Sequence, residues 1–588
     1  MATRLGAMAA ALIVLVSWAA LQLWGLEKAP FHTKGEPREA LVVHEILSGG
    51  GWVLPRRNGI ELPSKPPLFH WLGAVTAKVT GRVDERSIRL PSAVLSGAAA
   101  LMVFATGVLL WGPRAGLVAS LALLTSFEWL RAATSARVDM TLSAGLTFAV
   151  AGLLLFRSRG GTLWLIAAYA GSAWAVLSKG PIGLALPLLQ VLAMCVVDRR
   201  LTFPRQLRLG RGILGVALIG GLWYALALFK GGEAFFTKQI LTENLWRFVG
   251  TARFTEGHRH SVAYLFLALL AGLLPWTLLL PSAGAALWRD RHTLSRQDPR
   301  VFLIVWILIV FGFYAVASSK RGVYLLALYP AAALLLGWWI DQACVAVARP
   351  RWLSHVVAPI AWCVGAICAL LALVAAAEHA GSPLIVAGAS VAMGQVRPEV
   401  QHVATIVAGH AGFLLSLFSI AAVAAVVTAL AARVQRGGLV FAALLLCMTP
   451  VIVAVRQAIL PAVARATTRR TFVDSITRVL GGSRDVFSYR RFDYGVVFYW
   501  GAHMPVFKEQ LSASGPLHLV VAEGDWSRVG AIERRLYERI PGVESDRGGN
   551  LGPLILIQRV ATSPGAATSA HPSNAGAPPS EAEGGLPQ

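Results

Sequence analysis

The chain has 588 residues, of which 56% are hydrophobic and 14% are charged, and its mean hydropathy is +0.62. Soluble domains carry about 25% charged residues, so this composition excludes a water-soluble globular protein. The net charge of +23 would suit a nucleic-acid-binding protein, but the basic residues are spread over short loops between apolar runs. That distribution predicts a membrane protein without a nucleic-acid partner.

Apolar runs long enough to cross a bilayer recur throughout residues 1–460. They predict a polytopic α-helical membrane domain with about thirteen transmembrane helices. The first run is expected to be retained, because no small-residue cleavage site precedes Glu27. The predicted spans are 6–25, 88–111, 115–132, 138–156, 162–178, 181–197, 212–229, 262–286, 301–318, 322–340, 353–377, 403–432 and 437–457.

The arginines between the spans predict the orientation of the chain. With a cytoplasmic N-terminus, the inner loops hold Arg114, Arg157, Arg159, Arg199, Arg200, Arg205, Arg208, Arg211, Arg289, Arg291, Arg296, Arg300, Arg349, Arg351, Arg433 and Arg436. Short cytoplasmic loops are enriched in Lys and Arg. This pattern places the 27–87 loop, the 230–261 loop and the chain after about 458 on the outer face of a bacterial inner membrane.

The 27–87 loop is charge-dense and rich in Pro and Gly. The stretches PREALVVHEILSGG and KPPLFHWLGAVTAKV predict two interfacial helices, with Pro near the start of each and Trp71 as an interfacial anchor. The loop also carries Glu36, Arg38, Glu39, Arg56, Arg57 and Lys65. A long charged loop of this kind, next to short later loops, is a place where chemistry is expected.

The composition changes after the last span. Residues 461–560 predict a small soluble α/β domain on the outer side. DVFSYR, YGVVFYW, LHLVVAEG and LILIQRV are predicted strands, and TRRTFVDSITRVL and DWSRVGAIERRLYERI are predicted helices. Residues 561–588 are of low complexity and are predicted to be disordered.

Cysteine usage predicts neither disulfides nor a metal site of Cys type. All five cysteines lie in or beside apolar spans or on the inner side: Cys195, Cys344, Cys363, Cys368 and Cys447. None lies in a predicted outer segment, and their spacing fits no metal motif.

Charged residues at the outer ends of the spans are the candidate site, because charge beside a helical bundle is costly unless it is solvated or paired. Lys and Arg suit a phosphate leaving group, and a carboxylate can deprotonate an acceptor hydroxyl or stabilise positive charge at a sugar carbon. The set therefore favours sugar transfer from a polyprenyl-phosphate donor. Its members are Glu36, Arg38, Lys65, Asp139, Lys179, Glu243, Arg247, His258, Lys320 and Arg321.

Each candidate also has a purely structural interpretation. Lys65 could be a solvated or snorkelling charge, Asp139 an N-terminal helix cap, and Glu36 a solvated loop carboxylate. His258 and His260 could be ordinary loop histidines, and Arg56 and Arg57 contacts to lipid headgroups.

Several segments together resemble a known family. GEPREALVVHEILSGGGWVLPRRNGIELPSKPPLFHW, ARVDM, LSKGPIGLALP, ENLWRF with GHRH and LLPW, and SSKRGVYLLALYPAAALL occur in this order. They resemble the polytopic glycosyltransferases of GT-C fold related to protein O-mannosyltransferases, and especially the ArnT-type transferases that add aminoarabinose to lipid A. The resemblance implies a sugar donor linked to polyprenyl phosphate, a lipid or glycan acceptor, contact with membrane lipids and no nucleotide cofactor.

The resemblance also implies roles for residues. Lys65 is expected to contact the donor phosphate, with Lys179, Arg247, Lys320, Arg321 and Arg38 as further substrate-binding residues. The family's Asp-Glu pair is Gly35-Glu36 in this chain, so Glu36 or Asp139 is expected to supply the catalytic carboxylate. Ser64 replaces a family Glu that binds metal together with a loop His, so no metal is expected, and His258 is only a weak candidate ligand.

Two other functions remain open from the sequence. A transporter or flippase for a lipid-linked substrate would show inverted repeats with broken helices in corresponding halves, and no such pairing is visible. A catalytically silent homologue that binds prenyl phosphate remains open because of Gly35.

Overall fold

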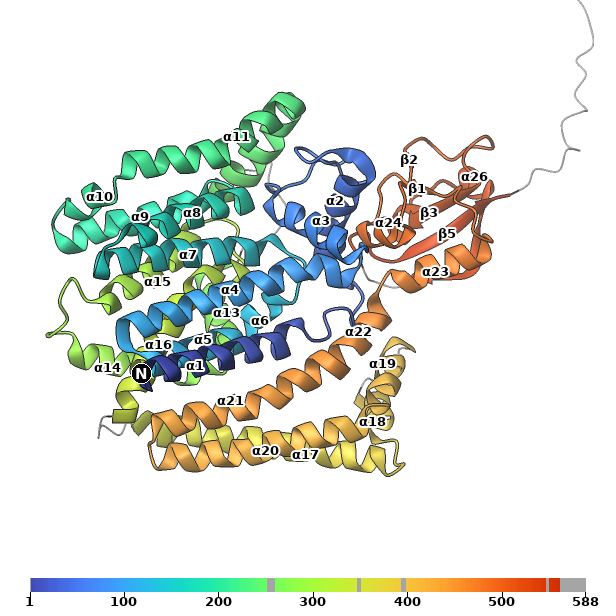
Figure 1. The fold of residues 1–588 in the computed structure, drawn as a ribbon. Helices are drawn as coiled ribbons and strands as arrows, with labels where there is room; N and C mark the ends of the chain where they lie inside the picture. The colour runs from blue at the N-terminus through green and yellow to red at the C-terminus, as the bar shows by residue number, and fades with distance from the viewer. Residues whose placement is uncertain (1, 251–259, 346–350, 393–397, 546–548, 561–588) are drawn as a thin grey trace, which may run out of the picture.

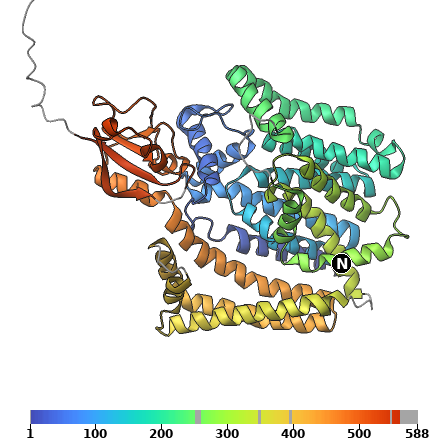
Figure 2. The same ribbon diagram turned by 180° about the vertical axis from the view of Figure 1, so that it is seen from behind.

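Long helices lie side by side through most of the molecule, and a small mixed domain sits at one end of them (Figures 1 and 2). The structure, a computed structural model, describes residues 2–250, 260–345, 351–392, 398–545 and 549–560. The bundle consists of α1 (Ala2–Trp18), η1 (Ala19–Leu23), α4 (Glu85–Trp111), α5 (Pro113–Thr125), α6 (Phe127–Ala133), α7 (Val138–Arg159), α8 (Thr162–Lys179), α9 (Ile182–Asp198), α10 (Thr202–Gln206), α11 (Leu209–Phe235), α13 (Val262–Gly272), η4 (Trp276–Leu278), α14 (Leu280–Asp290), α15 (Pro299–Val316), η5 (Gly322–Leu328), α16 (Tyr329–Val345), η6 (Leu353–Val357), α17 (Ala358–His379), α18 (Leu384–Ala392), α19 (Pro398–Ala408), α20 (Ala411–Arg433), α21 (Gly437–Ala454), η7 (Val455–Ile459) and α22 (Leu460–Thr467).

Within the described residues, nine helices are long and apolar enough to cross a membrane, and α5 with α6, bent by 69°, would make a tenth. The chain is therefore a multi-pass membrane protein. The nine coincide with nine of the thirteen predicted spans, and the bent pair coincides with 115–132. The predicted spans 162–178, 181–197 and 262–286 correspond to helices that are less apolar, shorter or interrupted, so the count of thirteen is not confirmed.

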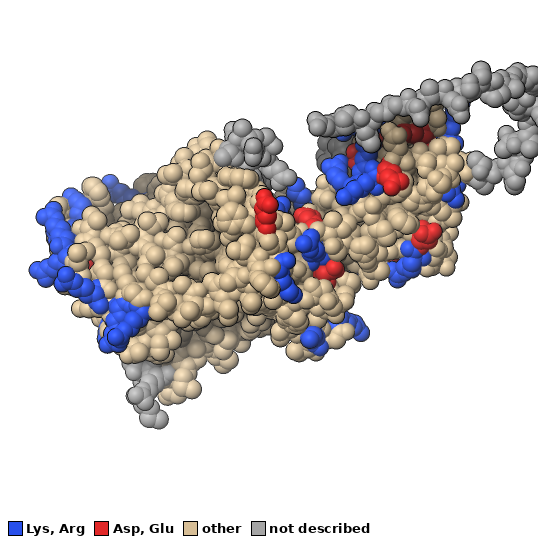
Figure 3. Space-filling model, turned by 90° about the horizontal axis from the view of Figure 1, so that it is seen from above, with Lys and Arg blue, Asp and Glu red and all other residues tan. Residues whose placement is uncertain are grey.

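On the face of the molecule seen in Figure 3, charge lies at the two ends. Figure 3 shows Lys and Arg at the end that carries α10, mixed charges towards the C-terminal domain, and an almost uncharged belt between them. The belt includes exposed large apolar side chains such as Leu218, Leu222 and Phe229 of α11. An apolar belt between charged ends is the surface expected of a protein that sits in a bilayer.

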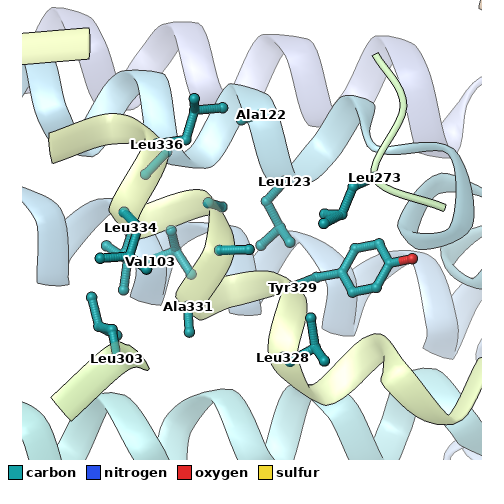
Figure 4. Close-up of a cluster of buried hydrophobic side chains, with 14 of the residues drawn as sticks. Val103, Ala122, Leu123, Leu273, Leu303, Leu328, Tyr329, Ala331, Leu334 and Leu336 are labelled. Carbon is teal, nitrogen blue, oxygen red and sulfur yellow. The ribbon is translucent and has the colours of Figure 1, made fainter. Parts of the chain in front are cut away.

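The core of the bundle is centred on α16, whose side chains contact α4, α5 and α15. Figure 4 shows Ala331, Leu334 and Leu336 of α16 among Val103, Ala122 and neighbouring apolar residues. Small residues let these helices approach closely. A Cβ at Gly337 would lie 2.4 Å from the Ala115 carbonyl oxygen, so only glycine fits at this crossing.

Two helices of the 27–87 loop and a helical extension of α11 cover one end of the bundle. The elements at this end are α2 (Gly35–Glu45), η2 (Ile46–Gly50), α3 (Leu68–Thr80), η3 (Phe236–Trp246) and α12 (Arg247–Val249). The two interfacial helices predicted in the first loop are therefore present as α2 and α3. The described part of 230–261 is helical up to Val249, whereas the sequence predicted a loop there.

The C-terminal domain has a five-stranded mixed sheet in the order β2-β1-β3-β5-β4. β1 is parallel to β2 and β3, and β5 pairs antiparallel with β3 and β4. Its elements are α23 (Arg470–Val479), β1 (Phe487–Tyr489), α24 (Tyr494–Trp500), β2 (Val506–Phe507), β3 (His518–Ala522), α25 (Glu523–Trp526), α26 (Ala531–Arg534), β4 (Tyr537–Ser545) and β5 (Leu554–Arg559).

Two local predictions in this domain were wrong. YGVVFYW is helix α24 and not a strand, because the Asp493 carboxylate accepts hydrogen bonds from the N–H groups of Gly495 and Val496, and Gly501 ends the helix at φ 69°. The predicted helix over 525–540 is two short turns that run into β4, since the chain from Tyr537 pairs with β5. In both places capping and pairing outweigh local composition.

The C-terminal domain and the first outer loop share one hydrophobic core. Buried residues of α2, α3, α23 and α24 and of the sheet form a single cluster. Asn58 and Met504 exchange two hydrogen bonds, with the Asn58 amide donating to the Met504 carbonyl at 2.8 Å and accepting from its N–H at 2.9 Å. Tyr499 donates to Glu85 at 2.8 Å and accepts from the Phe31 N–H at 2.7 Å.

Candidate active site

A partly open cavity of about 210 Å³ lies where α8, α9, η3 and α15 meet the 27–87 loop. Lys65, Lys179, Glu243 and Arg247 supply its charged lining, and Ile182, Phe248 and Phe313 are among its apolar walls. Lys65 precedes Pro66 and Pro67, which lack an N–H, and Pro67 caps the N-terminus of α3. The cavity thus brings together three of the predicted phosphate-binding cations, Lys65, Lys179 and Arg247.

Glu243 connects two of these cations. Its Oε2 accepts hydrogen bonds from the Lys65 Nζ and from the Arg247 Nη1, each at 2.6 Å. Only 10% of the Lys65 side chain and 9% of the Glu243 side chain are exposed. A shared carboxylate oxygen of this kind holds both cations at one point of the cavity wall.

Lys179 and Asp139 form a second ion pair beside the cavity. The Lys179 Nζ donates to the Asp139 Oδ1 at 2.5 Å and lies 4.4 Å from the centre of the Tyr324 ring. The second carboxylate oxygen of Asp139 has no hydrogen-bond donor among the described residues. The residue after Lys179 is Gly180, with φ 88°. A Cβ at this position would lie 2.8 Å from the Tyr224 hydroxyl, so a glycine is required here.

The surroundings of Lys65 shift its protonation. Burial lowers the pKa of Lys65 to about 8, with Arg247 and Lys179 acting in the same direction and Glu243 opposing them. Lys65 is therefore mostly charged at neutral pH but close to its titration range. An anion that enters the cavity would stabilise the charged form.

Glu36 lies away from this cavity and is fully paired. Its carboxylate accepts from the Arg89 Nε at 2.8 Å, from the Arg89 Nη2 at 3.1 Å and from the Ala136 N–H at 3.0 Å. Burial alone would raise the pKa of Glu36, but Arg89 and the Ala136 N–H hold it below its ordinary value. This ion pair joins α2 to α4, and the catalytic roles predicted for Glu36 and Asp139 stay predictions.

Glu36 instead lines a second cavity of about 480 Å³, between the first loop, α6 and the end of α21. Arg89, Arg131, Arg137 and Arg456 contribute charge to this cavity, and the rest of its lining is largely apolar. Gly35 stands where the family that the sequence resembles has an acidic residue. A Cβ at Gly35 would lie 3.3 Å from the Arg137 guanidinium, so this position is next to a cation. Arg137 lines this second cavity, whereas Asp139 lines neither cavity and contacts the first one through its ion-pair partner Lys179.

The remaining predicted residues are less central. Lys320 donates to the Ala317 carbonyl at 2.7 Å, and neither Lys320 nor Arg321 lines the first cavity. Arg321 contributes a positive charge near Asp139. Arg38 donates twice to Glu39, at 2.8 and 2.6 Å, and that carboxylate also contacts the His70 Nε2 at 2.8 Å. These residues surround the site, and their predicted substrate-binding roles stay predictions.

The described residues do not fit the metal site of the family. Ser64 is a buried neutral hydroxyl where the family has a metal-binding carboxylate. Among the described residues there is no group of three or more His, Cys, Asp and Glu that could hold a metal ion. His258 lies outside the described residues, so the expectation that no metal is bound stays a prediction.

Sequence reasoning missed two groups of this site. Arg89, the partner of Glu36, lies within the predicted span 88–111 and was not recognised as a candidate. A charge inside an apolar helix is itself a signal for a buried partner. Arg137 was overlooked because only the Asp of ARVDM matches the family pattern.

The Glu36–Arg89 pair yields a stability prediction. Arg89→Leu should lower the stability of the fold by about 3–5 kcal/mol, because it leaves the Glu36 carboxylate buried without its cation. Thermal unfolding in detergent measures this loss, with Arg86→Leu, an exposed arginine on the same helix, as control. Removing both charges in Arg89→Leu/Glu36→Leu should recover part of the loss, and an unchanged midpoint in Arg89→Leu would contradict the assignment.

The chain is similar to known proteins in sequence and in fold. Residues 64–224 match the family model of dolichyl-phosphate-mannose-protein mannosyltransferases. An undecaprenyl phosphate-α-4-amino-4-deoxy-L-arabinose arabinosyl transferase of Enterobacter sp. (strain 638) is 28% identical over 62% of this chain and 64% of its own length. Its counterpart from Aeromonas salmonicida is 27% identical over 53% and 56%, respectively. The chain thus spans less than two thirds of the length of these relatives.

The solved structures extend the likeness to nearly the whole chain. ArnT from Cupriavidus metallidurans bound to undecaprenyl phosphate superposes with a TM-score of 0.70 at 20% identity, over 94% of this chain and 98% of that one. Its apo structure superposes equally well, with a TM-score of 0.70. The chain has the GT-C fold of the ArnT-type glycosyltransferases and is related to them in sequence.

Proposed function

We propose that the protein is a membrane glycosyltransferase that moves a sugar from a polyprenyl-phosphate donor to a lipid or other envelope acceptor. The observation that carries the proposal is the convergence of Lys65, Lys179 and Arg247, from three distant parts of the chain, on one cavity with apolar walls. A phosphate needs fixed cations, and a prenyl chain needs an apolar surface that continues into the bilayer.

The chemistry follows from the lining residues. Lys65 and Arg247 would bind the donor phosphate and stabilise the charge that develops on it as the bond from the sugar carbon to the phosphate oxygen breaks. Asp139, held by Lys179, would take the proton of an acceptor hydroxyl or stabilise positive charge at the sugar carbon. The second cavity, lined by Glu36 and four arginines, would hold the acceptor.

The orientation is part of the proposal. The arginine-rich loops favour a cytoplasmic location for the end that carries α10, which puts both cavities and the C-terminal domain on the outer side of a bacterial inner membrane. Relatives named as undecaprenyl-phosphate aminoarabinose transferases support undecaprenyl phosphate as the carrier. Lipid A is the first acceptor to test.

The test is sugar release by the purified full-length protein in detergent from a panel of polyprenyl-phosphate sugars, with and without lipid A. We expect turnover with one donor that is stimulated by the acceptor. Binding of undecaprenyl phosphate without turnover on any donor would instead favour the catalytically silent homologue. Failure to bind the carrier at all would contradict the proposed site.

The pKa of Lys65 predicts how binding of the donor weakens at alkaline pH. Binding of the donor should weaken above about pH 8, where free Lys65 loses its proton. A phosphodiester donor does not titrate in this range, so direct binding of donor against pH measures this loss. Lys65→Arg should retain binding to higher pH because arginine stays protonated. If the loss of binding at alkaline pH were unchanged in this variant, the loss would be due to another group.

A further inference from the structure

The segment that carries Lys65 has almost no regular secondary structure. Between η2 and α3, the one regular feature among the described residues is an isolated β-bridge between Arg57 and Glu61. The backbone hydrogen bonds of a helix or a sheet therefore do not fix the position of Lys65. Contacts from other parts of the chain have to fix it, as is usual for a functional residue on a loop.

The start of this segment is anchored to α11. The Trp223 Nε1 donates to the Val53 carbonyl at 2.9 Å, and Leu54 packs in the same apolar cluster as Trp223 and Phe235. Figures 1 and 2 show the end of α11 beside the helices of the 27–87 loop. The continuation of α11 into η3 follows the segment towards Lys65.

Gln239 of η3 supplies an anchor two residues before Lys65. Its Nε2 donates to the Pro63 carbonyl at 2.8 Å, and only 1% of Gln239 is exposed. Pro63 is buried as well. Losing this hydrogen bond would be costly, because the Pro63 carbonyl would lose its donor in a place that water hardly reaches.

Gln239 and Glu243 hold the same segment from one helix. They lie four residues apart on η3; Gln239 bonds the main chain at Pro63, and Glu243 accepts from the Lys65 Nζ at 2.6 Å. η3 is a π-helix, a rare geometry that is often found at functional sites. Inside it the Asn244 amide donates to the Gln239 carbonyl at 2.5 Å. One helix thus fixes both the main chain next to Lys65 and its ammonium group.

We propose that Gln239 is a positioning residue for the donor phosphate, which holds the main chain of 63–65 so that the Lys65 ammonium lies in the first cavity. Gln239 does not line that cavity itself, so it acts on the phosphate through Lys65. The inference rests on the proposed function, because it concerns the phosphate site of that reaction. It adds an uncharged residue to a site otherwise defined by the cations Lys65, Lys179 and Arg247.

The first test is a double-mutant cycle on the affinity for undecaprenyl phosphate, measured with the purified full-length protein in detergent. Gln239→Met keeps the length of the side chain and removes the donor, so it should weaken binding about tenfold. In a Lys65→Met background the same substitution should have less than about a twofold further effect, since the residue through which it acts is gone.

The titration of Lys65 gives a second measurement, which needs no lipid. Labelling with an amine-reactive reagent over a range of pH, read by mass spectrometry of the Lys65 peptide, gives the midpoint. Burial lowers the pKa of Lys65 to about 8 against the attraction of Glu243, and Arg247 and Lys179 lower it further. In Gln239→Met the midpoint should rise towards the ordinary value of lysine, because the ammonium becomes less buried.

Gln190 provides a matched control. Its Nε2 donates to the Phe302 carbonyl at 3.0 Å, and it is 0% exposed between α9 and α15. Gln190→Met should lower the unfolding midpoint by a similar amount but change neither the affinity nor the titration of Lys65. If Gln239→Met does not fold, Gln239→Asn replaces it, since the shorter amide cannot reach the Pro63 carbonyl.

The outcomes separate this inference from the proposed function. An equal loss of affinity from Gln239→Met with and without Lys65, or an unchanged titration of Lys65, would overturn the inference and leave Gln239 with a role in stability alone. A wild-type protein that binds no undecaprenyl phosphate would overturn the proposed function. The titration would still show whether Gln239 positions Lys65.

Discussion

Lys65→Met should reduce turnover of a polyprenyl-phosphate sugar by on the order of 10³-fold. The substitution removes a cation that is 10% exposed and that lines the first cavity. It also removes one of the two cations that the Glu243 carboxylate contacts. Removing one partner of a buried charge pair costs about 2–5 kcal/mol, and the loss should appear in both the binding and the chemical step.

Initial rates of sugar release over a range of donor concentrations measure this effect. Lys78→Met is a matched control, because Lys78 is exposed on α3 and stacks over Trp52 away from the cavity. It should leave the rates unchanged. A Lys65→Met protein that folds and turns over at more than a tenth of the wild-type rate would contradict the role of Lys65 in phosphate binding.

Asp139→Asn should lower turnover by about 10²–10⁴-fold while leaving the fold intact. The amide keeps the size of the side chain and can still accept the hydrogen bond from Lys179, but it can neither take a proton nor stabilise positive charge. The affinity for the donor should change little, since Lys65 and Arg247 remain. Turnover and binding measured on the same preparation separate the two effects.

Glu36→Gln is the informative comparison for Asp139. Both oxygens of Glu36 are held by Arg89, and Oε1 also accepts from Ala136, so its neutralisation should lower the unfolding midpoint more than it lowers the rate at a permissive temperature. If Glu36→Gln abolishes turnover in a stable protein while Asp139→Asn remains active, the carboxylate assignment is wrong.

Much of the fold could be predicted because the length of an apolar run and the charge of a loop can both be read from the local sequence. The helices around Gly322–Cys344 and Val138–Arg159 lie where uninterrupted apolar runs occur, and the two interfacial helices follow from Pro and Gly at their ends. YGVVFYW shows the limit. Its β-branched and aromatic residues predict a strand, but the cap at Asp493 makes it a helix.

The site could be predicted only as a set of residues on one side of the membrane. Which carboxylate meets which cation depends on packing between segments that are far apart: Lys65 is paired with Glu243 across 178 residues, and Glu36 with Arg89 across 53. The sequence therefore left Glu36 and Asp139 as alternative candidates. Each forms an ion pair, Glu36 with Arg89 and Asp139 with Lys179, and their roles stay predictions. Lys320 and Arg321 lie outside the lining of the first cavity.

The shared core of the 27–87 loop and the C-terminal domain has a consequence for the order of assembly during synthesis. Hydrogen bonds between these parts join residues far apart in the chain, such as Thr468 to Phe31 across 437 positions and Phe31 to Tyr499 across 468. The ribosome makes the loop among the first segments and the domain among the last. The core that α2 and α3 share with the C-terminal domain can therefore form only after nearly the whole chain has been translated.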